Sequence, residues 1–493
     1  ADLHRIAAAI EEFRKSGKPV IAVGDSFSQG QYLLAASADE IWMHPQGAVL
    51  LTGYGAYSPF FAEGLDKLDV EVHVFKVGTY KSAVEPFIRN DMSEPAKEAN
   101  RAFLSVLWGS YLDHVARQRE IERASLESFL SSLDQAAIAA DGDLAKMALD
   151  HHLVDALKTH HEMRAAIAEK LGAGDADSYK RVGYREYLKA IGTKSPAGAK
   201  ARIAVITVEG AIVDGRGAPN EAGAERIVPQ IRRATRDDSV KAIVLRVNSP
   251  GGSAFASELI RQALVDAQKK GKPVVASFGP VAASGGYWIS STSDEIWAQP
   301  TTITGSIGIF GLFFGFNKSL ADLGIHTDGV GTTPFSDAFD PTRPFNPRVG
   351  AIIQKVIEHG YDEFLSRVAT GRKMSKEEVD RIGQGRVWAG ATARKLGLVD
   401  GLGSLADAVK AAAKRAGLEE GSYSVRHYDE KLSPFEQFLV NIAGQAGTVG
   451  QRLGLGQSST ARLTRHLEAS LERLRVFRDP HGAYALCMAC TVQ

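Results

Sequence analysis

The sequence contains little cysteine and no excess of either charge. Cys487 and Cys490 are the only cysteines in 493 residues, which excludes a fold stapled by several disulfides and leaves the redox compartment open. The 58 lysines and arginines balance the 58 aspartates and glutamates, so the broad positive field of a nucleic-acid-binding protein is missing. We therefore expect a globular protein without a nucleic-acid partner.

Long apolar runs are also missing. The most apolar stretch, residues 307–316 (IGIFGLFFGF), is about half as long as a membrane-spanning helix and is interrupted by glycines. It is a candidate for either the lining of a substrate groove or a buried core strand. The opening residues mix charged with apolar side chains and do not resemble a signal peptide.

The sequence lacks the usual patterns of cofactor sites. It contains no GxxxxGK[ST] loop, and no GxGxxG motif opens a helix. Cys487, Cys490 and His481 would supply only three metal ligands close to the C-terminus. We therefore expect no nucleotide, no other cofactor and no metal, and we interpret the end of the chain as a mobile tail.

One segment of the sequence occurs twice. Residues 32–45 (YLLAASADEIWMHP) and 287–300 (YWISSTSDEIWAQP) share the run DEIW at an offset of 255 residues. Further matches lie on both sides, including LVD at 153–155 and 398–400. Such self-similarity predicts two tandem copies of one domain.

The second copy has the pattern of alternating strands and helices, which predicts an α/β fold. Residues 202–208 (RIAVITV) and 241–247 (KAIVLRV) are apolar, β-branched runs typical of buried parallel strands. Apolar residues then recur at helical spacing behind Ser253, a suitable N-cap. The matching first strand of the first copy would lie before Ala1, so we expect that copy to be truncated at its N-terminus.

Composition suggests where the domains end. Residues 192–200 (GTKSPAGAK) have the composition of a linker, which assigns residues 1–191 to the first copy and 201–425 to the second. Residues 426–493 resemble neither copy. Within them, residues 464–477 form a basic amphipathic pattern that predicts a helix docked on its own protein, with a helix on a membrane surface as the alternative.

The two copies differ where a nucleophile could lie. Residues 279–287 read GPVAASGGY, whereas residues 24–32 read GDSFSQGQY, so Ser284 is opposed by Gln29. Small neighbours leave the Ser284 hydroxyl accessible at a turn from strand to helix, where helix amides favour developing negative charge. The alternative is a serine that only caps the helix.

A serine nucleophile needs a base, and the nearby sequence offers lysine rather than histidine. No histidine lies between His161 and His326, which disfavours a Ser/His/Asp triad. Lys81 lies among apolar residues in VGTYKSAVEP (77–86), and burial lowers the pKa of a lysine toward neutrality. The matching segment of the second copy has no lysine, so each copy holds one half of a Ser/Lys pair.

Two neighbouring glycines offer a site for an oxyanion. Gly251 and Gly252 follow the strand at 241–247 in the run NSPGG and precede a predicted helix. Their amides, together with that of Gly285 beside the serine, are candidates to stabilise a negatively charged oxygen. The alternative is a plain turn between strand and helix.

These segments resemble the long, duplicated signal peptide peptidase A type of the Ser/Lys peptidase family S49. The resemblance rests on VGTYKSAVEPFIRNDMS, VNSPGGSAFASELIR, AASGGYWIS, TTITGSIGIFG and RVWAGATARKLGLVDGLG, and it covers about residues 1–425. It implies a tandem βα superhelix of the crotonase and Clp-protease type. It also implies that Lys81 is the base, Ser284 the nucleophile and Ser306 a serine that orients the lysine.

The same resemblance implies a biological setting. The expected activity is serine endopeptidase cleavage of hydrophobic peptides, such as remnant signal peptides, through an acyl-enzyme. The expected protein is a homo-oligomer, a tetramer in this family, held in the bacterial inner membrane by an N-terminal anchor absent from this sequence, with its catalytic body on the periplasmic side.

Two alternatives stay open. The crotonase fold also serves acyl-CoA hydratases and isomerases, but that chemistry typically needs a carboxylate, and neither AASGGY nor SPGG contains glutamate. An inactive oligomeric scaffold is the second alternative. The presence of both Ser284 and Lys81 disfavours it.

Overall fold

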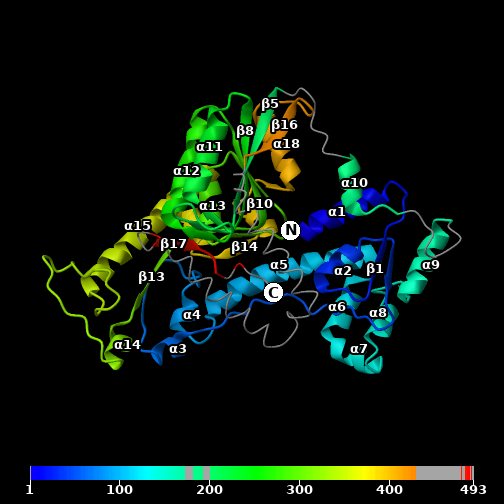
Figure 1. Cartoon of the computed structure of the whole chain (residues 1–493), viewed down its shortest axis with the longest axis horizontal. Coiled ribbons are helices and arrows are strands. Elements are labelled where there is room, and N and C mark those ends of the chain that lie inside the picture. Colours follow the sequence, from blue (N-terminus) through cyan, green and yellow to red (C-terminus); the bar gives the residue numbers. More distant parts are fainter. Residues whose placement is uncertain are drawn as a thin grey trace. The chain divides into compact units, whose positions relative to one another are not determined.

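The computed structural model describes residues 2–172, 181–191, 200–428, 479, 483–488 and 490. The chain forms two compact units (Figure 1). Unit 1 comprises Ala1–Gly55 and Leu104–Ala197, and unit 2 comprises Ala56–Phe103 and Gly198–Gln493. Residues 56–103, which we assigned to the first copy, therefore pack with the unit that holds the second. The predicted linker, apart from Lys200, lies outside the described residues, so the boundary between the repeats stays a prediction.

Unit 1 contains a small parallel sheet. Its strands lie in the order β1 (Ile21–Gly24), β2 (Glu40–Met43) and β4 (Ala156–Leu157). Its helices are α1 (Asp2–Arg14), α2 (Gln29–Ala35), the part of α5 (Glu94–Arg119) from Leu104 onward, α6 (Arg123–Ser131), α7 (Leu133–Ala139), α8 (Leu144–Asp150), α9 (His160–Lys170) and α10 (Tyr184–Ile191). A buried cluster around Tyr32, Ile41 and Tyr111 forms its core.

Unit 2 contains a larger sheet whose main path, within the described residues, runs β14-β12-β10-β8-β5-β16. Strands β11 and β15 extend it from β10. The strands are β5 (Ala201–Glu209), β8 (Val240–Ser249), β10 (Val274–Ala283), β11 (Glu295–Ala298), β12 (Ile303–Gly305), β14 (Val387–Ala389), β15 (Gly401–Leu402) and β16 (Tyr423–His427). Only β14 runs antiparallel to its neighbour, so the predicted α/β class with parallel strands is confirmed.

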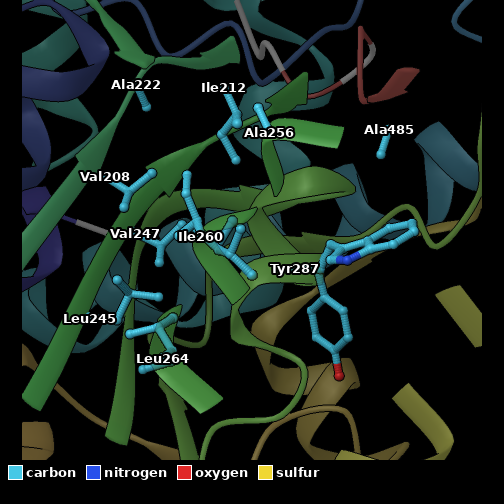
Figure 2. Close-up of a cluster of buried hydrophobic side chains, with 14 of the residues drawn as sticks. Val208, Ile212, Ala222, Leu245, Val247, Ala256, Ile260, Leu264, Tyr287 and Ala485 are labelled. Atoms are coloured by element: carbon cyan, nitrogen blue, oxygen red, sulfur yellow. The ribbon is translucent and has the colours of Figure 1, made fainter. Parts of the chain in front are cut away.

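Alternate residues of the central strands face opposite layers of helices. Ala204, Ile206 and Val208 of β5 face the cluster that includes α11 (Ala224–Arg236) and α12 (Ala254–Lys269). Ile203 and Val205 face α18 (Leu405–Arg415) on the other side. Figure 2 shows Val208, Leu245 and Val247 beside Ile260 and Leu264 of α12. Ser253 caps α12 through a bond from the Ala256 amide, as predicted.

A second sheet in unit 2 contains the strand that precedes the Lys81 loop and the strand that holds Gly251 and Gly252. Its order, among the described residues, is β3-β13-β17-β9-β6-β7. The strands are β3 (Glu71–Lys76), β6 (Ala211–Val213), β7 (Glu221–Gly223), β9 (Gly251–Ser253), β13 (Phe310–Gly315) and β17 (Ala483–Leu486). The apolar stretch at 307–316 therefore contains a strand, β13, and its Phe310 and Leu312 are buried.

The remaining helices of unit 2 surround these sheets. They are α3 (Ala62–Asp66), α4 (Glu85–Ile88), α13 (Gly285–Ser290), α14 (Asn317–Asp322), α15 (Pro347–Arg372), α16 (Lys376–Ile382) and α17 (Gly390–Lys395). Among the helices that the structure describes, none combines the length and hydropathy needed to cross a membrane.

The sequence repeat is matched by repeated hydrogen bonds inside the two units. In unit 1 the buried Tyr32 hydroxyl donates to the Leu153 carbonyl at 2.7 Å. In unit 2 the buried Tyr287 hydroxyl donates to the Leu398 carbonyl at 2.8 Å. Both tyrosines belong to the repeated segment that ends in DEIW, so the same residue makes the same bond in each copy.

A repeated aspartate also makes the same hydrogen bond in each unit. The Asp155 carboxylate accepts from the Ile41 amide at 2.7 Å, and the Asp400 carboxylate accepts from the Ile296 amide at 2.8 Å. Each aspartate belongs to an LVD run. The repeated letters therefore encode repeated tertiary contacts, as a duplicated α/β domain requires.

The C-terminal residues differ from our prediction of a mobile tail. Residues 483–486 form β17, a buried strand of the second sheet, because their small and apolar side chains fit between β9 and β13. Cys487 and Cys490 form a disulfide instead of offering metal ligands. The described residues contain no cluster of side chains suited to a metal ion. His481 and the predicted helix at 464–477 lie outside the described residues.

Candidate active site

Ser284 lies at the end of β10, where the chain turns into α13. Its φ of 54° is in the left-handed region, a conformation that a residue other than glycine adopts only when its surroundings hold it there. The Ser284 amide donates to the Gly305 carbonyl at 2.8 Å, which fixes this turn. The Ser284 side chain makes no capping bond to α13, so the alternative of a simple helix cap is wrong.

Ser306 follows β12, the neighbour of β10. Because β10 and β12 are parallel and paired through Ala283 and Gly305, the residues after them emerge side by side at the same edge of the sheet. Ser306 also has a positive φ, 51°, and follows Gly305 with a φ of 78°. The two serines therefore come from adjacent strand ends.

Lys81 reaches this edge from a loop between β3 and α4. Strand β3 pairs antiparallel with β13 over six residues, with Lys76 opposite Phe310. Ala83 and Val84, which follow the lysine, are buried beside Phe310. The lysine amine donates to Ser284 Oγ at 2.8 Å, to Ser306 Oγ at 3.1 Å and to the Ser306 carbonyl at 3.2 Å. The structure thus brings together the three side chains that the resemblance singled out.

The three side chains are closed off from solvent. Ser284 is 0%, Lys81 1% and Ser306 2% exposed. Burial disfavours the charged ammonium and lowers the pKa of Lys81 from 10.5 to about 7. A large fraction of the lysine is therefore neutral near pH 7, and a neutral amine can accept a proton from a serine hydroxyl.

The carboxylate nearest to Lys81 in sequence points elsewhere. Glu85 accepts from the Ser93 amide at 3.0 Å and from the Ser93 hydroxyl at 2.5 Å, which ties α4 to the start of α5. Within the described residues, the hydrogen bonds of the Lys81 amine go to the two serines only. This arrangement lacks the carboxylate base that hydratase chemistry typically needs.

The candidate oxyanion glycines are placed differently from our expectation. Gly251 and Gly252 have φ values of 97° and 155°, and both lie on β9. The Gly251 amide donates to Ser249 Oγ at 3.1 Å, so it does not face a free position beside the serine. The sequence could not show this contact, because it depends on the bend between β8 and β9. Gly252 and Gly285 keep their roles as predictions.

Sequence reasoning missed a turn that contacts both loops of the site. Residues 384–386 lie between α16 and β14. The Gln384 carbonyl accepts from the Tyr80 amide at 2.9 Å, and the Arg386 carbonyl accepts from the Ser306 amide at 2.7 Å. The only local signal is the run GQGR at 383–386, whose glycines allow a sharp turn.

Two histidines that could act as a base in place of the lysine lie outside the site. His73 lies on β3 with its ring stacked 4.1 Å from that of Phe345. His326 lies in an exposed loop after α14. Neither donates to or accepts from Ser284 in the described structure.

Comparison with known proteins connects this geometry to a family. The sequence model of Peptidase family S49 matches residues 12–173 and 266–419. The chain belongs to this family. As an S49 member it is a serine protease, which decides against the acyl-CoA hydratase alternative.

Relatives of this S49 chain match it over most of its length. It is 43% identical to "Protease 4" of Salmonella typhi over 493 residues, which covers 98% of this chain and 78% of the relative. It is 41% identical to "Protease 4" of Haemophilus influenzae over 499 residues, covering 98% and 79%. "Serine protease SPPA, chloroplastic" of Arabidopsis thaliana is 27% identical over 423 residues, covering 84% and 61%.

A solved structure of a ClpP1 point mutant from Listeria monocytogenes is similar at 15% identity with a TM-score of 0.29. It covers 42% of this S49 chain and 94% of the ClpP1 chain.

Proposed function

We propose that this S49 protease cleaves peptide bonds with Ser284 as nucleophile and Lys81 as base. The observation that carries the proposal is the 2.8 Å contact between Lys81 Nζ and Ser284 Oγ in a buried setting. In the first step the neutral amine takes the Ser284 proton while Oγ attacks the peptide carbonyl. The ammonium then protonates the leaving amine, and an acyl-enzyme remains.

The second half of the reaction uses the same two groups. The neutral amine takes a proton from water, the hydroxide attacks the acyl carbon, and the ammonium returns a proton to Ser284 Oγ. Ser306 holds the amine through its hydroxyl and its carbonyl, at 3.1 and 3.2 Å. We assign the oxyanion contacts to the Gly252 and Gly285 amides.

The resemblance to signal peptide peptidase A supports hydrophobic peptides, such as remnant signal peptides, as substrates. It also supports a homo-oligomer, anchored in the bacterial inner membrane, with the catalytic body in the periplasm. The disulfide between Cys487 and Cys490 agrees with an oxidising compartment of this kind.

The dyad is tested by substitutions at its two members. We expect Ser284→Ala and Lys81→Ala to lower kcat/KM for a hydrophobic peptide by at least about a thousandfold while the protein stays folded. Lys81→Arg keeps the charge but cannot lose its proton, so it should be equally inactive. Ser277→Ala, which alters a buried serine on β10, the strand that leads into Ser284, is the matched control and should stay active.

The pH dependence of kcat/KM gives a second test. Because only the neutral amine accepts a proton, activity should rise with pH through an apparent pKa near 7. If Lys81→Ala kept nearly wild-type turnover, the lysine would have no part in the mechanism. The same conclusion would follow if kcat/KM of the Lys81 variants rose with pH as it does in the wild type.

A further inference from the structure

The guanidinium of Arg386 lies against two aromatic rings beside the lysine loop. Its central carbon is 4.7 Å from the centroid of the Tyr80 ring and 4.5 Å from that of the Trp388 ring. Trp388 lies on β14, and its indole Nε1 donates to the Ile382 carbonyl at 2.9 Å, which fixes that ring. Tyr80 directly precedes Lys81 in the chain. Arg386 therefore connects the lysine loop to a strand of the main sheet.

Polar contacts fix the orientation of the Arg386 side chain. Its Nη1 donates to the Tyr80 hydroxyl at 3.1 Å, and its Nη2 forms an ion pair with the Glu98 carboxylate at 2.9 Å. The Tyr80 hydroxyl donates in turn to the second Glu98 oxygen at 3.3 Å. Within the described residues, Tyr80 and Glu98 are the titratable groups that contact the guanidinium.

The exposure of the partners shows which of these contacts holds the loop. The Glu98 side chain is 56% exposed, so solvent screens its ion pair and that pair contributes little. The Arg386 side chain is only 20% exposed, and its attraction to an aromatic face is stronger where water is excluded. We therefore expect the contact with the Tyr80 ring to hold the loop more firmly than the ion pair does.

The backbone of Arg386 contacts the other part of the site. Its carbonyl accepts from the Ser306 amide at 2.7 Å. Ser306 accepts from the Lys81 amine through both its hydroxyl and its carbonyl. One residue thus contacts the serine through its main chain and the lysine loop through its side chain.

We propose that Arg386 is a positioning residue of this protease: by holding Tyr80, it keeps the amine of the neighbouring lysine in contact with Ser284. The inference rests on the proposed function of Ser284 and Lys81. Within the described structure, Arg386 makes no hydrogen bond to either of these two side chains, so it acts through the loop. A planar guanidinium can lie on an aromatic ring and bond to oxygen atoms at its edge at the same time, which a lysine ammonium cannot do.

Loss of the guanidinium should affect Lys81 in two ways. The amine would spend less time at its 2.8 Å contact with Ser284 Oγ, which lowers kcat. A displaced amine would also be better hydrated. Because hydration favours the ammonium, the pKa of Lys81 would rise from about 7 toward its usual value of 10.5. The rising limb of kcat/KM against pH would then move to higher pH, which a residue that only stabilises the fold would not cause.

Arg386→Met tests these effects, because it removes the charge and keeps an unbranched side chain. We expect kcat at pH 7 to fall by at least about tenfold with little change in KM, and the rising limb to move up by about one pH unit. Arg386→Lys should lie between this variant and the wild type. Arg348→Met is the matched control, because Arg348 on α15 lies 4.6 Å from the Phe335 ring centroid and belongs to no segment of the site. It should leave kcat and the limb unchanged.

Variants of Tyr80 test whether Arg386 acts through this ring. Tyr80→Leu removes the ring and should reproduce the lower kcat and the shifted limb, whereas Tyr80→Phe keeps the ring and should lose less activity. The double variant Arg386→Met/Tyr80→Leu should be no less active than the weaker single variant, because both changes remove the same contact. Fully additive losses in folded proteins would show that the two residues act separately, and the proposal would be withdrawn.

Carbon-13 NMR of the lysine side chains measures the positioning without turnover. We titrate protein labelled at lysine Cε in the inactive Ser284→Ala background and assign the Lys81 signal by its loss in Lys81→Met. Adding Arg386→Met should raise the pKa of this lysine by about one unit. An unchanged Lys81 pKa in the folded variant would overturn the proposal. Because this measurement needs no catalysis, a raised pKa would stand even if the assignment of Ser284 as nucleophile failed.

Discussion

Lys81 is an unusual core residue, because it is 1% exposed and its amine contacts two hydroxyls and a carbonyl but no carboxylate. Its lowered pKa follows from this burial. Between about pH 7 and 10.5 the unfolded chain holds a proton on this lysine that the folded chain lacks. Folding is therefore favoured as the pH rises through that window.

A Lys81→Met variant makes this linkage measurable. We compare the free energy of unfolding of the wild type with that of the variant. The wild-type value minus the variant value should rise by about 4 kcal/mol between about pH 6.5 and 11. The reason is that only the wild type has a lysine at this position, whose pKa is lowered by folding, whereas methionine does not titrate. Urea titrations of both proteins across this range give the difference. A difference that stays flat would show that the amine is not desolvated in the folded protein.

Glu85 offers a contrasting residue, since it is close to Lys81 in sequence but bonded to Ser93. Glu85→Gln should leave the rising limb of kcat/KM against pH in place, because the carboxylate does not face the amine. The substitution should lower the thermal midpoint, because it weakens the contact that starts α5. A clear acid shift of the limb in this variant would mean that Glu85 reaches Lys81 during turnover.

The turn at 384–386 shows how an element far along the chain positions the lysine. A Cβ atom built on Gly385 would lie 2.7 Å from the Lys81 Cα and Cβ atoms, and Gly385 has a φ of 78°. Its backbone therefore lies directly against that of the lysine. Any side chain at Gly385 must push the loop of Lys81 away from Ser284.

Gly385→Ala tests this positioning against a matched control. We expect kcat/KM to fall by at least about tenfold, mainly through kcat, because the displaced amine no longer meets Ser284. Gly271 has nearly the same φ, 77°, but its Cβ position is open. Both alanine variants should lose about 1–2 kcal/mol of stability from backbone strain, while only Gly385→Ala loses activity. Equal activities would show that the turn does not position the lysine.

Considered as a whole molecule, the chain uses one set of contacts twice. Tyr32 in unit 1 and Tyr287 in unit 2 make the same buried hydrogen bond, yet only unit 2 holds the three side chains of the candidate site. The duplication therefore preserves a stabilising contact in both copies, while the groups proposed for catalysis are brought together in one unit.

Tyr32→Phe and Tyr287→Phe test whether these two equivalent hydrogen bonds act independently of each other. Each variant leaves a buried carbonyl without its hydroxyl donor, which costs about 1–3 kcal/mol. Hydrogen exchange followed by mass spectrometry should show faster exchange in β2 and β4 for Tyr32→Phe and in β10 and β11 for Tyr287→Phe. Because each bond lies within one unit, faster exchange of β10 in Tyr32→Phe would contradict the independence of the two contacts.

Several features of the fold were predictable because they depend on local pattern. The β-branched runs predicted strands β5 and β8, and Ser253 with the periodic residues after it predicted α12. The C-terminal strand was not predictable in this way. Its four residues, AYAL, have no strong strand pattern of their own and form a strand only because β9 and β13 offer partners on both sides.

The sequence by itself indicated the α/β class, the repeated domain and the pair Ser284 and Lys81, because these follow from periodicity, self-similarity and the differences between the two copies. The role of Ser306 came from the family resemblance. Only the tertiary structure decided that residues 56–103 belong with the second unit, that the Gly251 amide is already bonded and that β17 lies beside Ser284. Lys81 and Ser284 are 203 residues apart and meet because β3 pairs with β13. Such pairing depends on long-range packing that no local pattern encodes.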